Sequence, residues 1–148
     1  MRGIPYIPEE VHRPIYERCN PEYGDVLYIK DGVTTGIAMV NTLHEEFSLL
    51  SSVALLKQDG NVINGCFLCG ILNNAEMYLN IRMNMDGAAI TRLTIAKLNE
   101  IRVIVPPIEL QEQFATFVSQ TDKSRLTIQQ VLSKMEMVKL ALMQEYFK

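Results

Sequence analysis

Apolar and small residues recur at alternating intervals of three and four positions through the last forty residues, from Ile108 to Phe147. The positions are Phe114, Phe117, Thr121, Ser124, Ile128, Val131, Met135, Val138 and Leu142. This spacing places one side chain per turn on a single face, which is the seam that one α-helix presents to another. With a rise of about 1.5 Å per residue such a helix is roughly 60 Å long, more than a body of little over a hundred residues covers.

The pattern therefore predicts a helix that pairs with a partner. The residues we expect at its interface are the large apolar ones of the seam: Phe114, Phe117, Ile128, Val131, Met135, Val138 and Leu142. Thr121 and Ser124 make the middle of the seam thin, a feature that fixes the register of a coiled coil at some cost in stability. The alternative is a helix that folds back on its own body.

The sequence before the helix has the signature of an α+β body rich in sheet. We expect strands at Asp25–Lys30, Ile37–Val40 and Glu100–Val105. We expect one helix at Ala75–Asn84, ended by Asp86-Gly87, and another at Ile95–Asn99, capped by Thr94. Phe47–Leu56 is a further apolar segment, Val62–Leu72 is compatible with a strand or a short helix, and the first thirty residues are rich in turn formers. Pro106-Pro107 then breaks the chain. We predict a body at residues 1–105 and a long helix at residues 106–148.

Composition limits the classes of protein to which the chain can belong. With 148 residues, 48% hydrophobic residues and a mean hydropathy of +0.06, it is expected to fold as one globular body plus the helix. It has no apolar run of 18 residues, and its start does not resemble a signal peptide, so we expect a cytoplasmic protein. The formal net charge is −3, whereas proteins that grip DNA strongly on their own are usually basic.

The join between body and helix carries a family resemblance. Gly87-Ala-Ala-Ile runs through a Leu-based turn to Glu100-Ile-Arg-Val-Ile-Val105 and then to Pro106-Pro107-Ile-Glu-Leu-Gln-Glu-Gln113. Upstream, Gly24-Asp25-Val26-Leu27 opens a strand, and Leu142-Met-Gln-Glu-Tyr-Phe147 closes the helix. Together these segments resemble a target recognition domain and the conserved spacer helix of type I restriction-modification specificity subunits.

The resemblance implies a function that composition does not supply. Specificity subunits of this family read the two halves of a split DNA site with two recognition domains, and their two long helices pack antiparallel, set the gap between half-sites and dock the modification (methyltransferase) subunits. They are not catalytic. This chain has one recognition unit, lacking the family's N-terminal third, and one helix, so we expect it to act as a homodimer on double-stranded DNA.

Candidate DNA-binding residues are the hydroxyl and basic side chains of the body. The loop from Lys30 to Gly36 combines glycines, hydroxyls and a lysine, which suits an approach to phosphates or base edges, although an ordinary hairpin turn has the same composition. Arginine reads guanine through two hydrogen bonds, and lysine mostly contacts phosphate. The candidates are Lys30, Thr34, Thr35, Lys57, Arg82, Arg92 and Lys97.

Motifs for catalysis and metal binding are missing from the sequence. There is no phosphate-binding loop, no Gly-x-Ser-x-Gly and no His-Glu-x-x-His, so we expect no enzyme activity and no cofactor. Cys66 and Cys69 have too few partners at useful spacing for a zinc site, and we interpret them as core residues. The leading hypothesis is a DNA-recognition half-subunit. The alternative is a truncated remnant that acts only as a helix-mediated interaction module.

Overall fold

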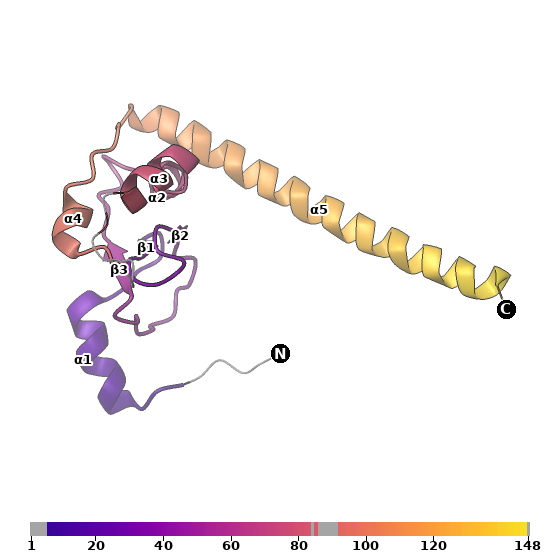
Figure 1. The fold of residues 1–148 in the computed structure, drawn as a ribbon, viewed down its shortest axis with the longest axis horizontal. Coiled ribbons are helices and arrows are strands. Elements are labelled where there is room, and N and C mark those ends of the chain that lie inside the picture. Colours follow the sequence, from indigo (N-terminus) through magenta and orange to yellow (C-terminus); the bar gives the residue numbers. More distant parts are fainter. Residues whose placement is uncertain (1–5, 84, 86–91, 148) are drawn as a thin grey trace. The chain divides into compact units, whose positions relative to one another are not determined.

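The computed structural model describes residues 6–83, 85 and 92–147 (Figure 1). In chain order its elements are α1 (Glu9–Cys19), β1 (Val26–Ile29), β2 (Ala38–Val40), β3 (Val53–Leu56), α2 (Gly65–Leu72), α3 (Ala75–Met83), α4 (Ile95–Asn99) and α5 (Ile108–Tyr146). The chain divides into two compact units, Met1–Gln111 and Glu112–Lys148. A small antiparallel sheet, short helices and one long C-terminal helix make this a mixed fold of the α+β type.

The sheet has the order β2-β1-β3, and both outer strands run antiparallel to β1. Val26 of β1 pairs with Val40 on one side and Leu56 on the other. Val26 and Tyr28 are fully buried, whereas the residues between and after them are half-buried, as the period of two in a strand requires. The hairpin predicted between the first two strands is confirmed.

Helix α2 packs on β1 and β2 and completes the core of the body. The sequence of Val62–Leu72 is compatible with a strand or a helix, and in the structure Gly65–Leu72 is helical. The Asn64 side chain caps this helix by accepting hydrogen bonds from the amides of Cys66 and Phe67. After the helix, Asn73 bonds both the amide and the carbonyl of Ala38 at 2.9 and 2.8 Å. Its amide group thus pairs backbone groups of the edge strand β2 as a neighbouring strand does.

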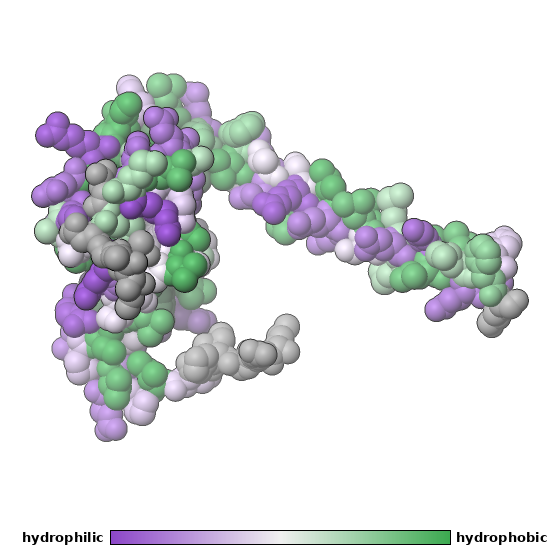
Figure 2. Space-filling view, in the orientation of Figure 1, coloured by the Kyte–Doolittle hydropathy of each residue, from purple (hydrophilic) through white to green (hydrophobic). Residues whose placement is uncertain are grey.

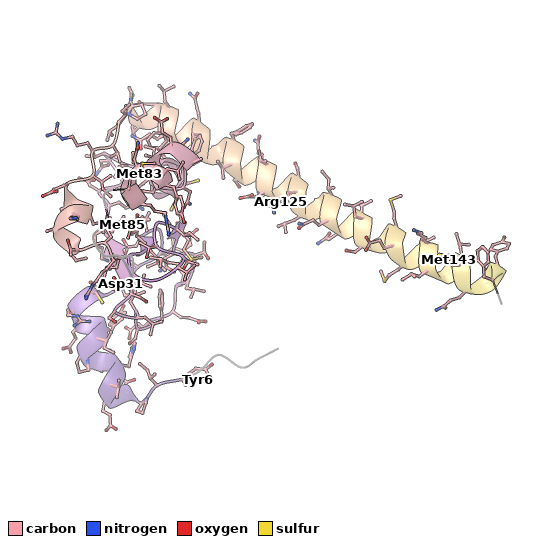
Figure 3. The ribbon with its side chains drawn as sticks, in the orientation of Figure 1. Tyr6, Asp31, Met83, Met85, Arg125 and Met143 are labelled. Atoms are coloured by element: carbon pink, nitrogen blue, oxygen red, sulfur yellow. The ribbon has the colours of Figure 1, made fainter. Side chains whose placement is uncertain are left out.

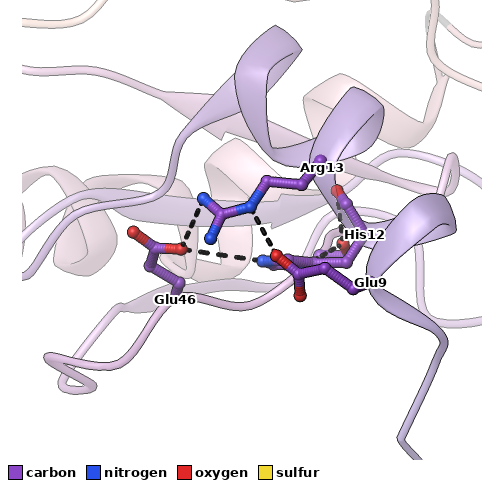
Figure 4. Close-up of polar contacts among 5 residues, drawn as sticks. Glu9, His12, Arg13 and Glu46 are labelled. Carbon is purple, nitrogen blue, oxygen red and sulfur yellow. Dashed lines mark hydrogen bonds and ion pairs between the residues drawn. The ribbon is translucent and has the colours of Figure 1, made fainter.

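Helix α1 lies in the N-terminal region that the sequence led us to expect as turns. The prolines led to the wrong expectation, because Pro14 lies inside the helix although an interior proline cannot donate to the carbonyl four residues earlier and usually disfavours a helix. No residue of α1 is buried. The helix is instead joined to the loop after β2 by polar contacts: His12 Nδ1 lies 2.8 Å from Ser48 Oγ, and Arg13 bridges Glu9 and Glu46 (Figure 4).

The strand predicted at Glu100–Val105 is wrong. Residues 101–107 are described as neither helix nor strand, and within the described residues they carry no ladder to the sheet. Ile101 packs against the core and Val103 is half-buried, while Ile104 is 85% exposed. The apolar alternation therefore buries side chains without strand pairing, and Pro106 and Pro107 then offer no backbone N–H.

The two helices predicted nearest the C-terminus are confirmed. Thr94 caps α4 by accepting the amide of Lys97 at 3.3 Å. Helix α5 runs uninterrupted from Ile108 to Tyr146 (Figure 1). The helix predicted at Ala75–Asn84 is observed as α3 up to Met83, while Asn84, the Asp86-Gly87 stop and the Gly87 part of the family motif lie outside the described residues. No helix in the described part of the chain has the length and apolarity to cross a membrane.

Gln111, in the first turns of α5, is fully buried by the body. Its Nε2 donates to the carbonyls of Pro106 and Val62 at 2.7 and 3.1 Å, and its Oε1 accepts the amide of Asn64 at 2.8 Å. One amide side chain thus joins the irregular segment before α5, the turn before α2 and the start of α5.

Candidate nucleic-acid interface

The loop that joins β1 to β2 has a closely bonded backbone. The Gly36 amide donates to the Ile29 carbonyl at 2.8 Å, and the Thr35 amide and hydroxyl both donate to the Gly32 carbonyl, at 3.1 and 2.6 Å. Gly32 and Gly36 adopt φ values of 97° and 107°, which other residues rarely adopt. These bonds hold Val33 and Thr34 at the tip of the hairpin.

Arg82 of α3 fixes the same loop from the side. Its Nη1 lies 3.3 Å from the Val33 carbonyl, 3.1 Å from the Thr35 carbonyl and 3.1 Å from the Tyr78 hydroxyl. Its guanidinium also lies over the Tyr78 ring, 5.4 Å from the centroid. The Tyr78 ring in turn packs so closely on Gly36 that a Cβ there would lie 2.7 Å from it. The loop is therefore seated on α3 through contacts that allow little change.

Two further cations lie at the base of the loop. Lys30 Nζ lies 2.8 Å from Asp31, and Arg92 Nε lies 3.3 Å from the same carboxylate. The backbone pairs there as well, because the Leu93 amide donates to the Lys30 carbonyl at 2.8 Å. Two cations sharing one carboxylate leave one positive charge in excess, and Arg82 adds another.

The structure thus brings together five of the seven residues proposed to bind DNA, but not all of them face outward. Thr35 is fully buried with its hydroxyl turned into the loop, so its side chain offers no contact to DNA, and this part of the prediction is corrected. The side chain of Lys30 is only 12% exposed. Thr34 is exposed, and so is the Arg92 side chain, at 68%.

Lys57 and Lys97 contact other parts of the body. Lys57 Nζ contacts Glu22 and Asp25 at 2.8 and 2.9 Å. Burial lowers the pKa of Lys57, but its hydrogen bonds to the two carboxylates outweigh that effect and raise the pKa above its usual value. Lys97 on α4 is half-buried and lines a hollow of about 430 Å³ with Met77 and Ile81 of α3.

Sequence reasoning missed Val33 and Tyr78. Val33 is 90% exposed at the tip of the loop. Its signal was present, since an apolar residue stands inside the turn sequence Asp-Gly-Val-Thr-Thr-Gly where polar residues are usual. Tyr78 had no local signal, because its contact with the loop crosses more than forty residues of sequence.

Helix α5 presents the second candidate surface. None of residues 112–147 is buried, and apolar side chains recur between polar ones along the rod (Figure 2). Side chains project from the helix on different sides, among them Arg125 and Met143 (Figure 3). All seven residues predicted for the interface are exposed, from 37% at Phe114 to 66% at Phe117.

The two hydroxyl residues of the seam are satisfied within the helix. Thr121 Oγ1 donates to the Phe117 carbonyl and Ser124 Oγ donates to the Gln120 carbonyl, each at 2.9 Å. A hydroxyl that already has a partner can be covered by another helix without losing a hydrogen bond to water. The thin middle of the seam is therefore compatible with burial.

The cysteines have the environment of packing residues. Cys69 is buried in the core and Cys66, one turn before it in α2, is half-buried. Burial, with a smaller contribution from Cys66, raises the pKa of the Cys69 thiol to about 12. Within residues 6–83, 85 and 92–147 no cluster of three or more His, Cys, Asp or Glu side chains is placed to hold a metal ion.

No protein-family model matches the chain, and no curated protein matches it in sequence.

Proposed function

We propose that the chain is the DNA-recognition half-subunit of a type I restriction-modification complex. The body binds one half of a split site in double-stranded DNA, helix α5 pairs antiparallel with α5 of a second copy, and the pair docks the modification subunit. The chain itself catalyses nothing. The observation that carries this proposal is a 39-residue helix with an exposed heptad seam, attached to a small body with a cation-flanked, fixed loop.

The order of residues along the seam favours antiparallel over parallel pairing. In a parallel pair Thr121 would face Thr121 and Ser124 would face Ser124, which puts two weak layers side by side. An antiparallel register gives every layer at least one large apolar residue: Phe114 with Val138, Phe117 with Met135, Thr121 with Val131, and Ser124 with Ile128. A second copy of this chain is therefore a well-matched partner for the seam.

The length of the helix sets the separation of the two recognition bodies. At about 1.5 Å per residue, α5 spans roughly 58 Å, and an antiparallel pair places the two first turns at opposite ends. Two bodies related by a twofold axis read an inverted repeat, because each meets its half-site in the same orientation. The proposal therefore requires a split, palindromic site with an unread gap.

The charge of the body favours binding within a complex over strong binding alone. The net charge of the chain is −3, and Lys30, Lys57 and Arg92 already have carboxylate partners. Counterion release supplies most of the affinity of isolated DNA-binding proteins, and an acidic chain releases few counterions. Two bodies joined by a coil gain from effective concentration, and a docked modification subunit adds contacts of its own.

The test is selection from a randomised duplex library at moderate salt, with the purified full-length chain. We expect enrichment of a split inverted repeat with a fixed gap. The matched control carries Ile128→Asp and Val131→Asp in the seam and leaves the body unchanged, and it should lose the second half-site and the fixed gap. A library that stays random, from a chain shown to be folded and dimeric, would refute DNA recognition.

That outcome would leave the second candidate, a helix-mediated interaction module without specific DNA binding. The observation in its favour is that the carboxylates Glu22, Asp25 and Asp31 occupy cations that DNA would otherwise meet. Both candidates require a paired α5, so the selection separates them and an oligomeric-state measurement alone does not.

A further inference from the structure

The most exposed apolar side chain of the hairpin loop is Val33, at 90%. It stands at the tip, where a turn usually carries polar residues. A polar residue at this position would keep the same turn, so the turn itself does not require a valine. Such a residue, held outward on a fixed loop, has the properties of a contact residue.

The backbone around Val33 is fixed on both sides. Arg82 binds the Val33 carbonyl itself and the Thr35 carbonyl, at 3.3 and 3.1 Å. The Ile37 amide closes the turn on the Thr34 carbonyl at 3.3 Å. The tip therefore has little conformational entropy to lose when it binds, which favours its use in recognition.

We propose that Val33 reads thymine, by contacting the C5-methyl group in the major groove. This inference rests on the proposed function and names one residue that confers sequence preference. A valine has no hydrogen-bonding group, and the thymine methyl is the one apolar group on a base edge in the major groove. The side chains that wedge between base pairs in the minor groove are usually larger, such as Phe, Leu, Ile or Met.

The charges beside the tip suit this approach. Arg92 is exposed at the base of the loop, and Arg82 lies behind it. The exposed side of Arg92 meets a phosphate flanking the groove and sets the orientation while the tip contacts the base, whereas Arg82 stays bound to the loop carbonyls. The adjacent Thr34, also exposed, supplies a hydroxyl next to the valine methyls.

The experiment replaces each thymine of the selected half-site with deoxyuracil, which removes only the methyl group. Binding of wild-type chain and of Val33→Ala is measured on the thymine and uracil duplexes. At one position we expect the uracil duplex to bind the wild type about three- to tenfold more weakly than the thymine duplex, and this loss to be clearly smaller for Val33→Ala, which keeps only one methyl group at the tip. The matched control is Val62→Ala, which shortens another exposed valine, 57% exposed, and should keep the wild-type preference.

Two results would overturn the inference while leaving the proposed function standing. The first is a loss on uracil substitution that is equal in wild type and Val33→Ala. The second is a Val33→Ala chain that keeps its DNA preference but loses a protein partner, which would make the tip a protein contact. A wild-type chain that is folded and dimeric but selects no DNA sequence overturns the proposed function, and the reading of thymine with it.

Discussion

The two units of the chain keep their structure in opposite ways. In residues 6–111, buried apolar residues form a core, and polar side chains such as Asn73 and Gln111 pair backbone groups that the small sheet leaves open. In residues 112–147 no side chain is buried and the apolar residues stand in solvent. Isolated helices gain little stability from propensity alone. The body is stabilised by its own core, whereas the apolar seam of α5 is left uncovered by the described residues, and we propose that a second copy covers it.

The largest expected effect is on the dissociation constant of the proposed α5 dimer. Ile128→Asp with Val131→Asp puts four carboxylates into the seam of each proposed dimer, and burying unpaired charge is costly. We expect the dissociation constant of the dimer to rise at least about 100-fold. Sedimentation equilibrium over a range of chain concentrations measures it.

The control for that change keeps the added charge and moves it off the seam. Gln129→Asp with Gln130→Asp alters exposed polar positions beside Ile128 and should leave the dimer within about threefold of wild type. If both double substitutions weakened the dimer equally, charge alone, rather than the seam, would govern association.

The next effect concerns the body at the point where α5 begins. Gln111→Ala removes three hydrogen bonds. The carbonyls of Pro106 and Val62 lose their donor, and the Asn64 amide loses its acceptor. We expect the free energy of unfolding to fall by about 2–4 kcal/mol, because buried groups left unpaired lose their full solvation. Urea titration at one fixed chain concentration measures this, since a dimer's stability depends on concentration.

Gln113→Ala serves as its comparison, because Gln113 is an exposed glutamine two residues further along the same helix. Its effect should stay within about 0.5 kcal/mol. A similar small effect of Gln111→Ala would mean that the buried amide is not needed to join the start of α5 to the body.

A smaller effect separates backbone strain from packing in the hairpin loop. Gly32→Ala and Gly36→Ala both place a side chain at positive φ, at a cost of roughly 1–2 kcal/mol. An added Cβ at Gly32 meets nothing within 4 Å, whereas at Gly36 it would lie 2.7 Å from the Tyr78 ring. We expect thermal unfolding to show a loss at Gly36 about 1 kcal/mol larger than at Gly32.

The Tyr78→Ala background tests the cause of that difference. With the ring removed, the two alanine substitutions should cost nearly the same. A difference that persists without Tyr78 would place its origin in the loop backbone and not in the contact with α3.

Local signals predicted much of this fold. The strand at Val26–Ile29, the hairpin to Ala38–Val40, the Thr94 cap and the long helix all follow from periodicity and capping within a few residues. Helix α1 was missed because its prolines outweighed its helical pattern, and the strand at Glu100–Val105 was overpredicted because alternation reports side-chain burial and not ladder pairing.

The candidate site was predicted less well, for a physical reason. Sequence composition identified the loop and its cations, but whether a residue faces water depends on contacts between distant segments. Thr35 is buried and Arg82 turns toward the loop carbonyls because α3 packs beside the hairpin. No local pattern reports such contacts, whereas Val33 did have a local signal, because it is an apolar residue within a turn sequence of polar residues and glycines.

The last expected effect is a pH dependence of the stability of the body, because the three cysteines, Cys19, Cys66 and Cys69, all precede the rod. Burial raises the pKa of the Cys69 thiol to about 12, whereas a thiol in an unfolded chain ionises near pH 8.5. Below about pH 8 the thiol is protonated in both states and pH has no effect through it. Between about pH 9 and 12 the unfolded chain loses the proton and the folded chain keeps it, so stability falls as pH rises.

Cys69→Ala removes this titration and should be less stable than wild type at pH 7.5, by an amount that shrinks toward pH 10.5. Cys19→Ala, which removes a half-buried thiol outside the core, controls for the loss of a sulfur. A stability difference between wild type and Cys69→Ala that stays constant with pH would contradict a buried Cys69 thiol that keeps its proton in the folded chain.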